Sequence, residues 1–150
     1  MAPPGVNSFY YYAFTAVDPL LSISAIYLNY FSPQTILRPA FPATSSYATI
    51  TPAVTYLQPQ AGGAFAMFAF LMLFMLLSTD DLKVWKRFQT ALLFTDMAVL
   101  YSSWKAVEVQ GSWWTTEGAG NVAIVLVVTL VRVLFVAGVG VGRGKSAKRA

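Results

Sequence analysis

The sequence predicts an all-α integral membrane protein, a four-helix bundle with a long proline-rich loop between its first and second helices. Of its 150 residues, 57% are hydrophobic and 11% are charged, whereas soluble domains hold about 25% charged residues. The apolar residues gather in blocks about as long as the ~20 residues that a helix needs to cross a bilayer. Most of the eight prolines lie outside these blocks. We expect residues 1–150 to form one transmembrane domain.

The predicted spans cover residues of about 8–30, 61–78, 88–107 and 119–141, followed by a basic tail over 142–150. In the first span Pro19 follows Asp18, and we expect the proline to disturb the helix beside this carboxylate. Residues 31–60 contain five prolines, and we expect a loop that covers the membrane face as a lid. Trp113 and Trp114 predict an aromatic belt between the third and fourth spans.

Basic residues predict the orientation of the bundle. Seven fall on the side of the termini and two on the other: Lys83, Lys86, Arg87, Arg143, Lys145, Lys148 and Arg149 against Arg38 and Lys105. This bias predicts both termini in the cytosol, and we expect the membrane of the endoplasmic reticulum. The net charge of +4 then belongs to a membrane flank. We therefore expect the lipid bilayer, and no nucleic acid, as a partner.

The chain contains no cysteine and no histidine. Thiol nucleophiles, disulfides and the commonest general base are excluded, and zinc sites of the usual kind are not expected. The chemistry left to the protein is that of carboxylates, tyrosines and basic side chains. We expect a site without metal or cofactor.

Three charged side chains lie at one predicted depth. Asp18, Asp96 and Arg132 each fall within about two residues of the middle of their span, or roughly 3 Å along a helix axis. A charge at the bilayer centre costs at least about 2.5–3.5 kcal/mol. We therefore expect the three side chains to meet inside the bundle.

Polar residues recur on the same helical faces. Gln89 and Ser103 lie seven residues before and after the second aspartate, and Tyr11 lies seven before the first. Asn121 shares a stripe with the arginine, and Tyr101 follows the second aspartate by five residues. We expect Tyr101, Asn121 and Tyr11 to position a substrate, although most tyrosines in such a chain are belt or packing residues.

Two interpretations of the charged trio remain open. In the first, Arg132 pairs with one aspartate, and the network only fixes helix register. In the second, Asp18, Asp96 and Arg132 are catalytic. One arginine cannot neutralise two carboxylates, so the pair shares a proton and provides an acid and a base. Opening an epoxide requires those two roles, because an acid protonates the oxygen while a base activates water or a hydroxyl.

The chain resembles a family of small fungal four-span membrane proteins from secondary-metabolite gene clusters. The resemblance rests on "AVDPLLS", "SPQT", "TDDLKVWK", "DMAVLY", "GN" and "VRVLF". Similar members are epoxide hydrolases of polyene-pyrone biosynthesis, of the aurovertin, citreoviridin and asteltoxin type. There a flavin monooxygenase epoxidises the polyene, and the hydrolase opens the epoxides to oxygen heterocycles. The resemblance carries over five candidate residues: Asp18, Asp96, Tyr101, Asn121 and Arg132.

The resemblance implies a membrane-embedded epoxide hydrolase and cyclase of mycotoxin biosynthesis that acts on a lipophilic polyene-epoxide. The pathway's flavin monooxygenase is an expected partner. Two other classes stay open. One is a non-catalytic membrane scaffold or lipophilic-ligand-binding protein, in which the arginine fixes register. The other is a membrane isomerase or terpene cyclase, which uses an intramembrane acid without adding water.

Overall fold

In the computed structural model, residues 3–110 and 116–142 are described, and they form helices and turns without a β-strand. The first rod consists of α1 (Ser8–Tyr12), the π-helical segment η1 (Ala13–Val17) and α2 (Asp18–Phe31). The second consists of α4 (Pro52–Phe70) and the π-helical segment η3 (Leu71–Leu76), and the last two are α5 (Leu82–Gln110) and α6 (Thr116–Ala137). The predicted all-α class is confirmed.

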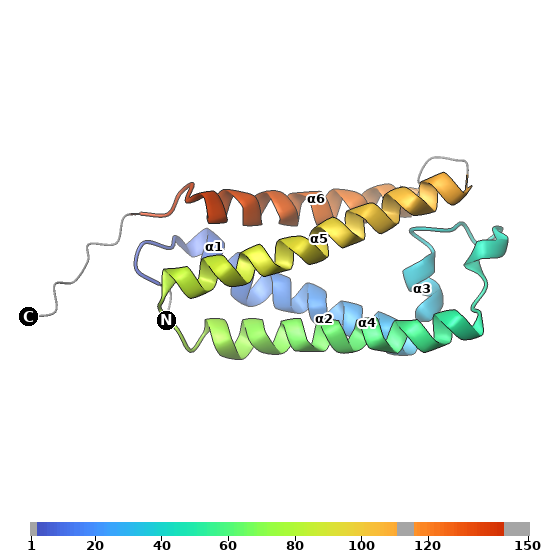
Figure 1. Ribbon diagram of the computed structural model, residues 1–150, viewed down its shortest axis with the longest axis horizontal. Helices are drawn as coiled ribbons and strands as arrows, with labels where there is room; N and C mark the ends of the chain where they lie inside the picture. The colour runs from blue at the N-terminus through green and yellow to red at the C-terminus, as the bar shows by residue number, and fades with distance from the viewer. Residues whose placement is uncertain (1–2, 111–115, 143–150) are drawn as a thin grey trace, which may run out of the picture.

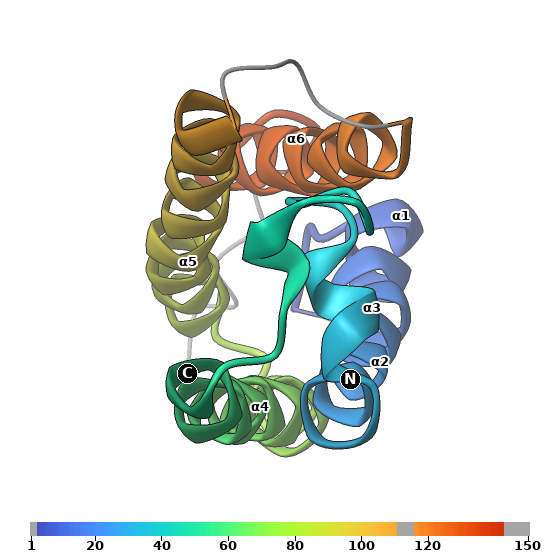
Figure 2. The same cartoon turned by 90° about the vertical axis from the view of Figure 1, so that its right-hand side faces the viewer.

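The rods pack as two pairs (Figures 1 and 2). α2 lies along α4 and α5 lies along α6, and the first rod also meets the second where η1 contacts η3. The described ends of the chain meet at the left end of Figure 1, where the Gly142 N–H donates to the Gly5 carbonyl at 2.8 Å. The turn between η3 and α5 lies at the same end.

The disturbance expected at Pro19 is a wide helical turn directly before it. The backbone N–H of Asp18 donates to the Ala13 carbonyl, five residues back rather than four. A proline within a helix has no N–H, and its ring crowds the preceding turn. π-helical turns of this kind relieve such strain and often occur at functional sites. The wide turn ends at Asp18, whose side chain is buried.

The predicted loop over residues 31–60 begins where the structure has it, because α2 ends at Phe31, but its other end is wrong. α4 already begins at Pro52, with Thr51 as its N-cap, and Pro59 lies inside the helix. Proline at the first helical position costs no hydrogen bond, because a backbone N–H there would have no partner within the helix. Pro59 is on the exposed face, so its ring does not disturb the packing against α2.

The shorter connection left between α2 and α4 contains the helix α3 (Pro33–Leu37) and the 3-10 turn η2 (Ser46–Ala48). This segment crosses one end of the helices (Figure 2) and is tied to the end of α5, because the Gln110 side chain donates to the Ala40 carbonyl. The expected belt at Trp113 and Trp114, and the basic tail beyond residue 142, lie outside the described residues.

An aromatic cluster fills the end of the molecule where the chain ends meet. It consists of eight buried side chains: Tyr10, Phe14, Met72, Leu76, Trp85, Phe88, Leu92 and Phe135. Tyr10 also donates its hydroxyl to the Val139 carbonyl at 2.9 Å, and the Lys86 ammonium donates to the Val136 carbonyl at 3.0 Å. A cation at a helix C-terminus is favourable. Each of the four rods contributes to this cluster, through α1 and η1, η3, α5 and α6, so it joins the two pairs.

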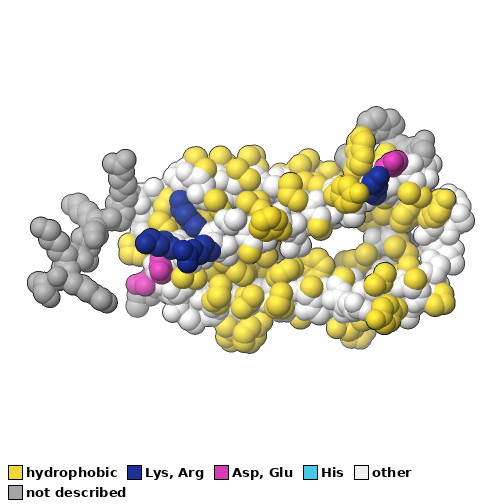
Figure 3. Space-filling view, in the orientation of Figure 1, with side chains coloured by type: hydrophobic (Ala, Val, Ile, Leu, Met, Phe, Trp, Pro, Cys, Tyr) yellow, Lys and Arg dark blue, Asp and Glu magenta, His cyan; other side chains and the backbone are white. Residues whose placement is uncertain are grey.

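Two helical stretches, Pro52–Leu76 and Thr116–Ala137, are long and apolar enough to cross a membrane by length and composition. Large hydrophobic side chains are also exposed along the other helices, as the yellow surface in Figure 3 shows. Soluble monomers rarely expose apolar surface on this scale. These observations indicate association with a membrane.

We predict that Phe14→Ala lowers the free energy of unfolding by about 3–5 kcal/mol, because it leaves a cavity in the aromatic cluster. Phe14 is 1% exposed, whereas Phe9 on the same rod is 62% exposed. Phe9→Ala is the matched control and should change stability little. Denaturant titration of both variants in detergent measures the difference. Equal effects would contradict the assignment of this cluster as the core.

Candidate functional site

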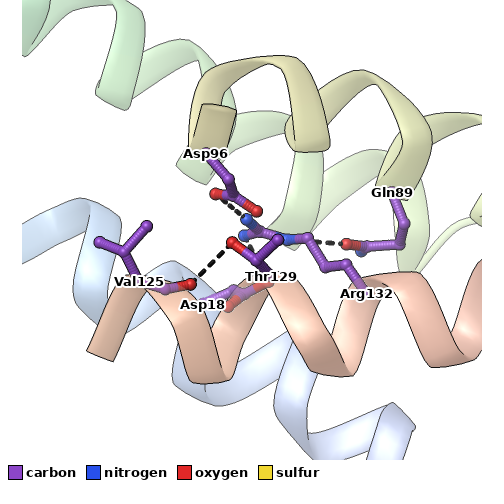
Figure 4. Close-up of polar contacts among 6 residues, drawn as sticks. All are labelled: Asp18, Gln89, Asp96, Val125, Thr129 and Arg132. Carbon is purple, nitrogen blue, oxygen red and sulfur yellow. Dashed lines mark hydrogen bonds and ion pairs between the residues drawn. The ribbon is translucent and has the colours of Figure 1, made fainter. Parts of the chain in front are cut away.

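The guanidinium of Arg132 joins three helices (Figure 4). From α6 its Nη2 donates to Asp18 Oδ2 on α2 at 2.9 Å, and its Nη1 donates to Asp96 Oδ1 on α5. Its Nε donates to Gln89 Oε1, also on α5, at 3.2 Å. Each of the three nitrogens therefore has a different acceptor. We call these four residues the arginine cluster.

Local helix geometry aims each side chain at this point. Gln89 and Asp96 are seven residues apart on α5, which places them on one face two turns apart. Asp18 follows the wide turn of η1. Phe135 of the aromatic cluster follows Arg132 one turn later on α6. The arginine cluster therefore lies next to the aromatic cluster.

The arginine cluster is buried. Asp18, Asp96 and Arg132 are 5%, 8% and 7% exposed, and Gln89 is fully buried. In the described residues the other ion pair is Lys105–Glu108, which is about half exposed. Exposed pairs contribute little to stability, whereas a buried charge that loses its partner costs several kcal/mol. The three charges therefore depend on one another.

Two polar atoms of the cluster make no hydrogen bond within the described protein. Asp96 Oδ2 and Gln89 Nε2 are both buried and unpartnered. Because Gln89 Oε1 accepts from Arg132, its amide orientation is fixed and Nε2 remains a free donor. Buried polar atoms are nearly always paired, and an exception calls for an explanation. A free acceptor and a free donor beside one cation suit a small polar ligand.

Thr129 is the other polar residue close to Arg132 on α6, and its side chain already has a hydrogen-bond partner. Thr129 donates its hydroxyl to the Val125 carbonyl at 2.7 Å (Figure 4). It satisfies its own helix rather than the guanidinium. Among the described residues no group of three or more histidine, cysteine or carboxylate side chains is arranged to hold a metal.

Of the six site residues expected from sequence, the structure brings Asp18, Asp96 and Arg132 together. It does not bring the three expected positioning residues to them. Tyr101 is 64% exposed, with Lys105 Nζ 5.9 Å from its ring centroid. Asn121 is exposed on α6. Tyr11 stacks on Trp85, with centroids 6.2 Å apart, at the edge of the aromatic cluster.

Gln89 was not expected as a site residue, although the sequence contains a pattern that could have identified it. It lies seven residues before Asp96, on the polar stripe of that helix. A glutamine on such a stripe is easily taken for a packing residue. Nothing in the sequence shows that the Nε of Arg132 donates to it.

A family model described as a domain of unknown function, DUF7704, matches residues 5–142. The chain belongs to this family. The matched range contains the whole arginine cluster and both chain segments that meet at Gly5 and Gly142. No curated protein and no solved structure matches the chain.

The arrangement has a defined chemical capacity. Two carboxylates bound to one guanidinium carry one more negative charge than the cation balances. A carboxyl group can serve as an acid or as a base, so a pair of them can supply both roles in one reaction. The guanidinium holds both at fixed positions, since its planar donors match carboxylate oxygens.

We predict that Arg132→Met lowers the free energy of unfolding by about 3–5 kcal/mol, because it leaves two carboxylates buried without their cation. Combining it with Asp18→Leu and Asp96→Leu should recover much of the loss. Lys105→Met, which breaks the exposed ion pair on α5, is the matched control and should cost no more than about 1 kcal/mol. Denaturant titration in detergent compares the variants. A triple variant as unstable as the single one would contradict the pairing.

Proposed function

We propose that this chain is a membrane-embedded epoxide hydrolase and cyclase that opens epoxides of a lipophilic polyene polyketide to oxygen heterocycles. The observation that carries the proposal is the buried arginine cluster, with two carboxylates on one guanidinium and the unpartnered Asp96 Oδ2. The resemblance to fungal epoxide hydrolases of mycotoxin pathways supplies the substrate class. A pathway flavin monooxygenase is the proposed source of the epoxide.

The proposed setting is a bundle of four membrane spans in the endoplasmic reticulum, with both termini in the cytosol. Exposed hydrophobic side chains on all four rods support it. So does the gathering of lysine and arginine side chains, next to acidic ones, at the left end of Figure 3. Basic residues concentrate on the cytosolic side of membrane proteins. In this setting the arginine cluster is a charged site within an apolar layer, which is a functional-site candidate by default.

In the proposed reaction the aspartates have separate roles. Asp18, in its protonated form, donates a proton to the epoxide oxygen as one carbon–oxygen bond of the ring breaks. Asp96 Oδ2 takes a proton from water, whose oxygen forms the new bond to the opened carbon and yields a diol. When a hydroxyl of the substrate replaces water, the new bond closes a cyclic ether. One proton enters Asp96 for each proton that leaves Asp18, so the count balances.

Arg132 and Gln89 serve this reaction by position. Arg132 holds both carboxyls through separate nitrogens, so neither can turn away from the reacting epoxide. Gln89 fixes the guanidinium through Nε, and its free Nε2 can donate to the oxygen of water or substrate. After turnover the proton returns from Asp96 to Asp18 through a product or solvent hydroxyl, or the two roles reverse.

The non-catalytic alternative has one observation in its favour. The charges are 5–8% exposed, which also suits a network that only fixes the positions of α2, α5 and α6. A pure register device needs no unpartnered buried atoms, because each one costs stability. The free Asp96 Oδ2 and Gln89 Nε2 are why the enzyme is preferred.

We predict that Asp96→Asn and Asp18→Asn each reduce epoxide turnover by at least about 10²-fold, because each removes one proton-transfer role. Membranes with the protein are incubated with an epoxidised polyene in oxygen-18 water, and the products are analysed by mass spectrometry. Glu108→Gln, an exposed carboxylate on α5, is the matched control and should keep full activity. Label should appear in diols formed by hydrolysis. Full turnover in both aspartate variants rules out the mechanism, and a rearranged product without label indicates the isomerase.

We predict that single cysteines reveal the four-span arrangement, because the chain has no native cysteine. In sealed microsomes, Asp80→Cys should react with a membrane-impermeant maleimide, since it lies at the end assigned to the cytosol. Ser46→Cys, in the segment across the opposite end, should react only after permeabilisation. Labelling of both positions in sealed vesicles would contradict the arrangement.

A further inference from the structure

A groove of about 390 Å³ lies between α4 and α5. Figure 3 shows this face of the molecule hollowed between α5 above and α4 below. Three aromatic and three small side chains line it: Phe65, Phe68, Phe94, Ala61, Ala64 and Ala98. No charged side chain lines the groove, so its chemistry is that of a hydrocarbon binding site.

The groove and the arginine cluster share one turn of α5. The remaining lining residue of the groove is Thr95, the residue directly before Asp96. Successive residues of a helix point about 100° apart, so Asp96 lies on the face next to the groove wall. The α5 wall of the groove therefore adjoins the buried face that carries Asp96, which is 8% exposed.

The shape of the groove selects its occupant. The alanines let a ligand approach the backbones of both helices, and the rings of Phe65 and Phe94 offer flat apolar walls. A volume of about 390 Å³ lies at the small end of the range for small-molecule sites, roughly 300–1,000 Å³. A helix of a second protein copy, about 10–12 Å across with its side chains, is too wide for it.

We infer that this groove binds the extended, unsaturated hydrocarbon chain of the substrate and admits it sideways between α4 and α5. This inference rests on the proposed function and adds to it the place where the polyene chain lies and the side from which it enters. The epoxide end lies inward at Asp96, and the apolar chain lies against the phenylalanines. Asp96 acts on the epoxide, and the groove determines which chain lengths and shapes the site accepts.

The test fills the groove from either wall. Ala64→Phe on α4 and Ala98→Phe on α5 each add a ring to it, and the use of both keeps the test valid if one variant fails to fold. The matched controls are Ala66→Phe on α4 and Ala91→Phe on α5, which are exposed alanines outside the groove. Each protein is assayed in nanodiscs with a long conjugated-chain epoxide and with 1,2-epoxybutane.

For the groove-filled variants we expect a KM for the long epoxide at least about tenfold higher, with turnover of 1,2-epoxybutane unchanged. The controls should behave as the unaltered protein. Unchanged kinetics with the long epoxide overturn the groove and leave the proposed function standing. Equal losses on both epoxides overturn it as well, because the added ring then disturbs the site as a whole.

A measurement without catalysis separates the groove from the reaction. Parinaric acid, a fluorescent conjugated tetraene, is titrated into nanodiscs of saturated lipid that contain each protein. We expect saturable binding by the unaltered protein and both controls, and at least about tenfold weaker binding by the groove-filled variants. If the unaltered protein opens neither epoxide, the proposed function fails, while this titration still decides the groove. Equal binding by all five proteins overturns the groove, since the probe then occupies lipid.

Discussion

The fold is organised around one guanidinium. Arg132 donates through three nitrogens to Asp18, Asp96 and Gln89, and so links α2, α5 and α6 at a single point. Charges buried at this depth are tolerated only when they are paired. The wide turn that accompanies Pro19 and the seven-residue spacing on α5 both meet this requirement, since Asp18, Gln89 and Asp96 all reach the same cation.

The second rod, which consists of α4 and η3, stands apart from that network. None of the four residues of the arginine cluster belongs to α4, which is held by packing along α2 and by the contact of η3 with η1. Packing without ionic ties allows small adjustments of one helix against another. The groove occurs on this rod's other side, facing α5. One wall of the groove therefore comes from the rod outside the arginine cluster, and the other comes from α5, which carries Gln89 and Asp96.

The sequence predicted the meeting of the charged side chains well and the rotation of the helices poorly. The meeting of Asp18, Asp96 and Arg132 was predictable, because charged side chains in apolar helices have no low-energy alternative to pairing when they are buried. The positions of Tyr101 and Asn121 were not predictable, because the side chain of a tyrosine or an asparagine can make its hydrogen bonds outside the bundle as well as inside it. On α6 the buried line passes through Gly118 and Val122, which leaves Asn121 just beyond its edge. Pro59 misled because its effect depends on which face of α4 it occupies.

The 114 residues that separate Asp18 from Arg132 affect how the protein is made. Under the four-span arrangement the first helix enters the bilayer while the ribosome has yet to synthesise the last one. At about 5–20 residues per second, the aspartate waits several seconds or longer for its cation. During that interval a translocon or membrane chaperone must shelter it, and release into free lipid has to follow completion of the final helix.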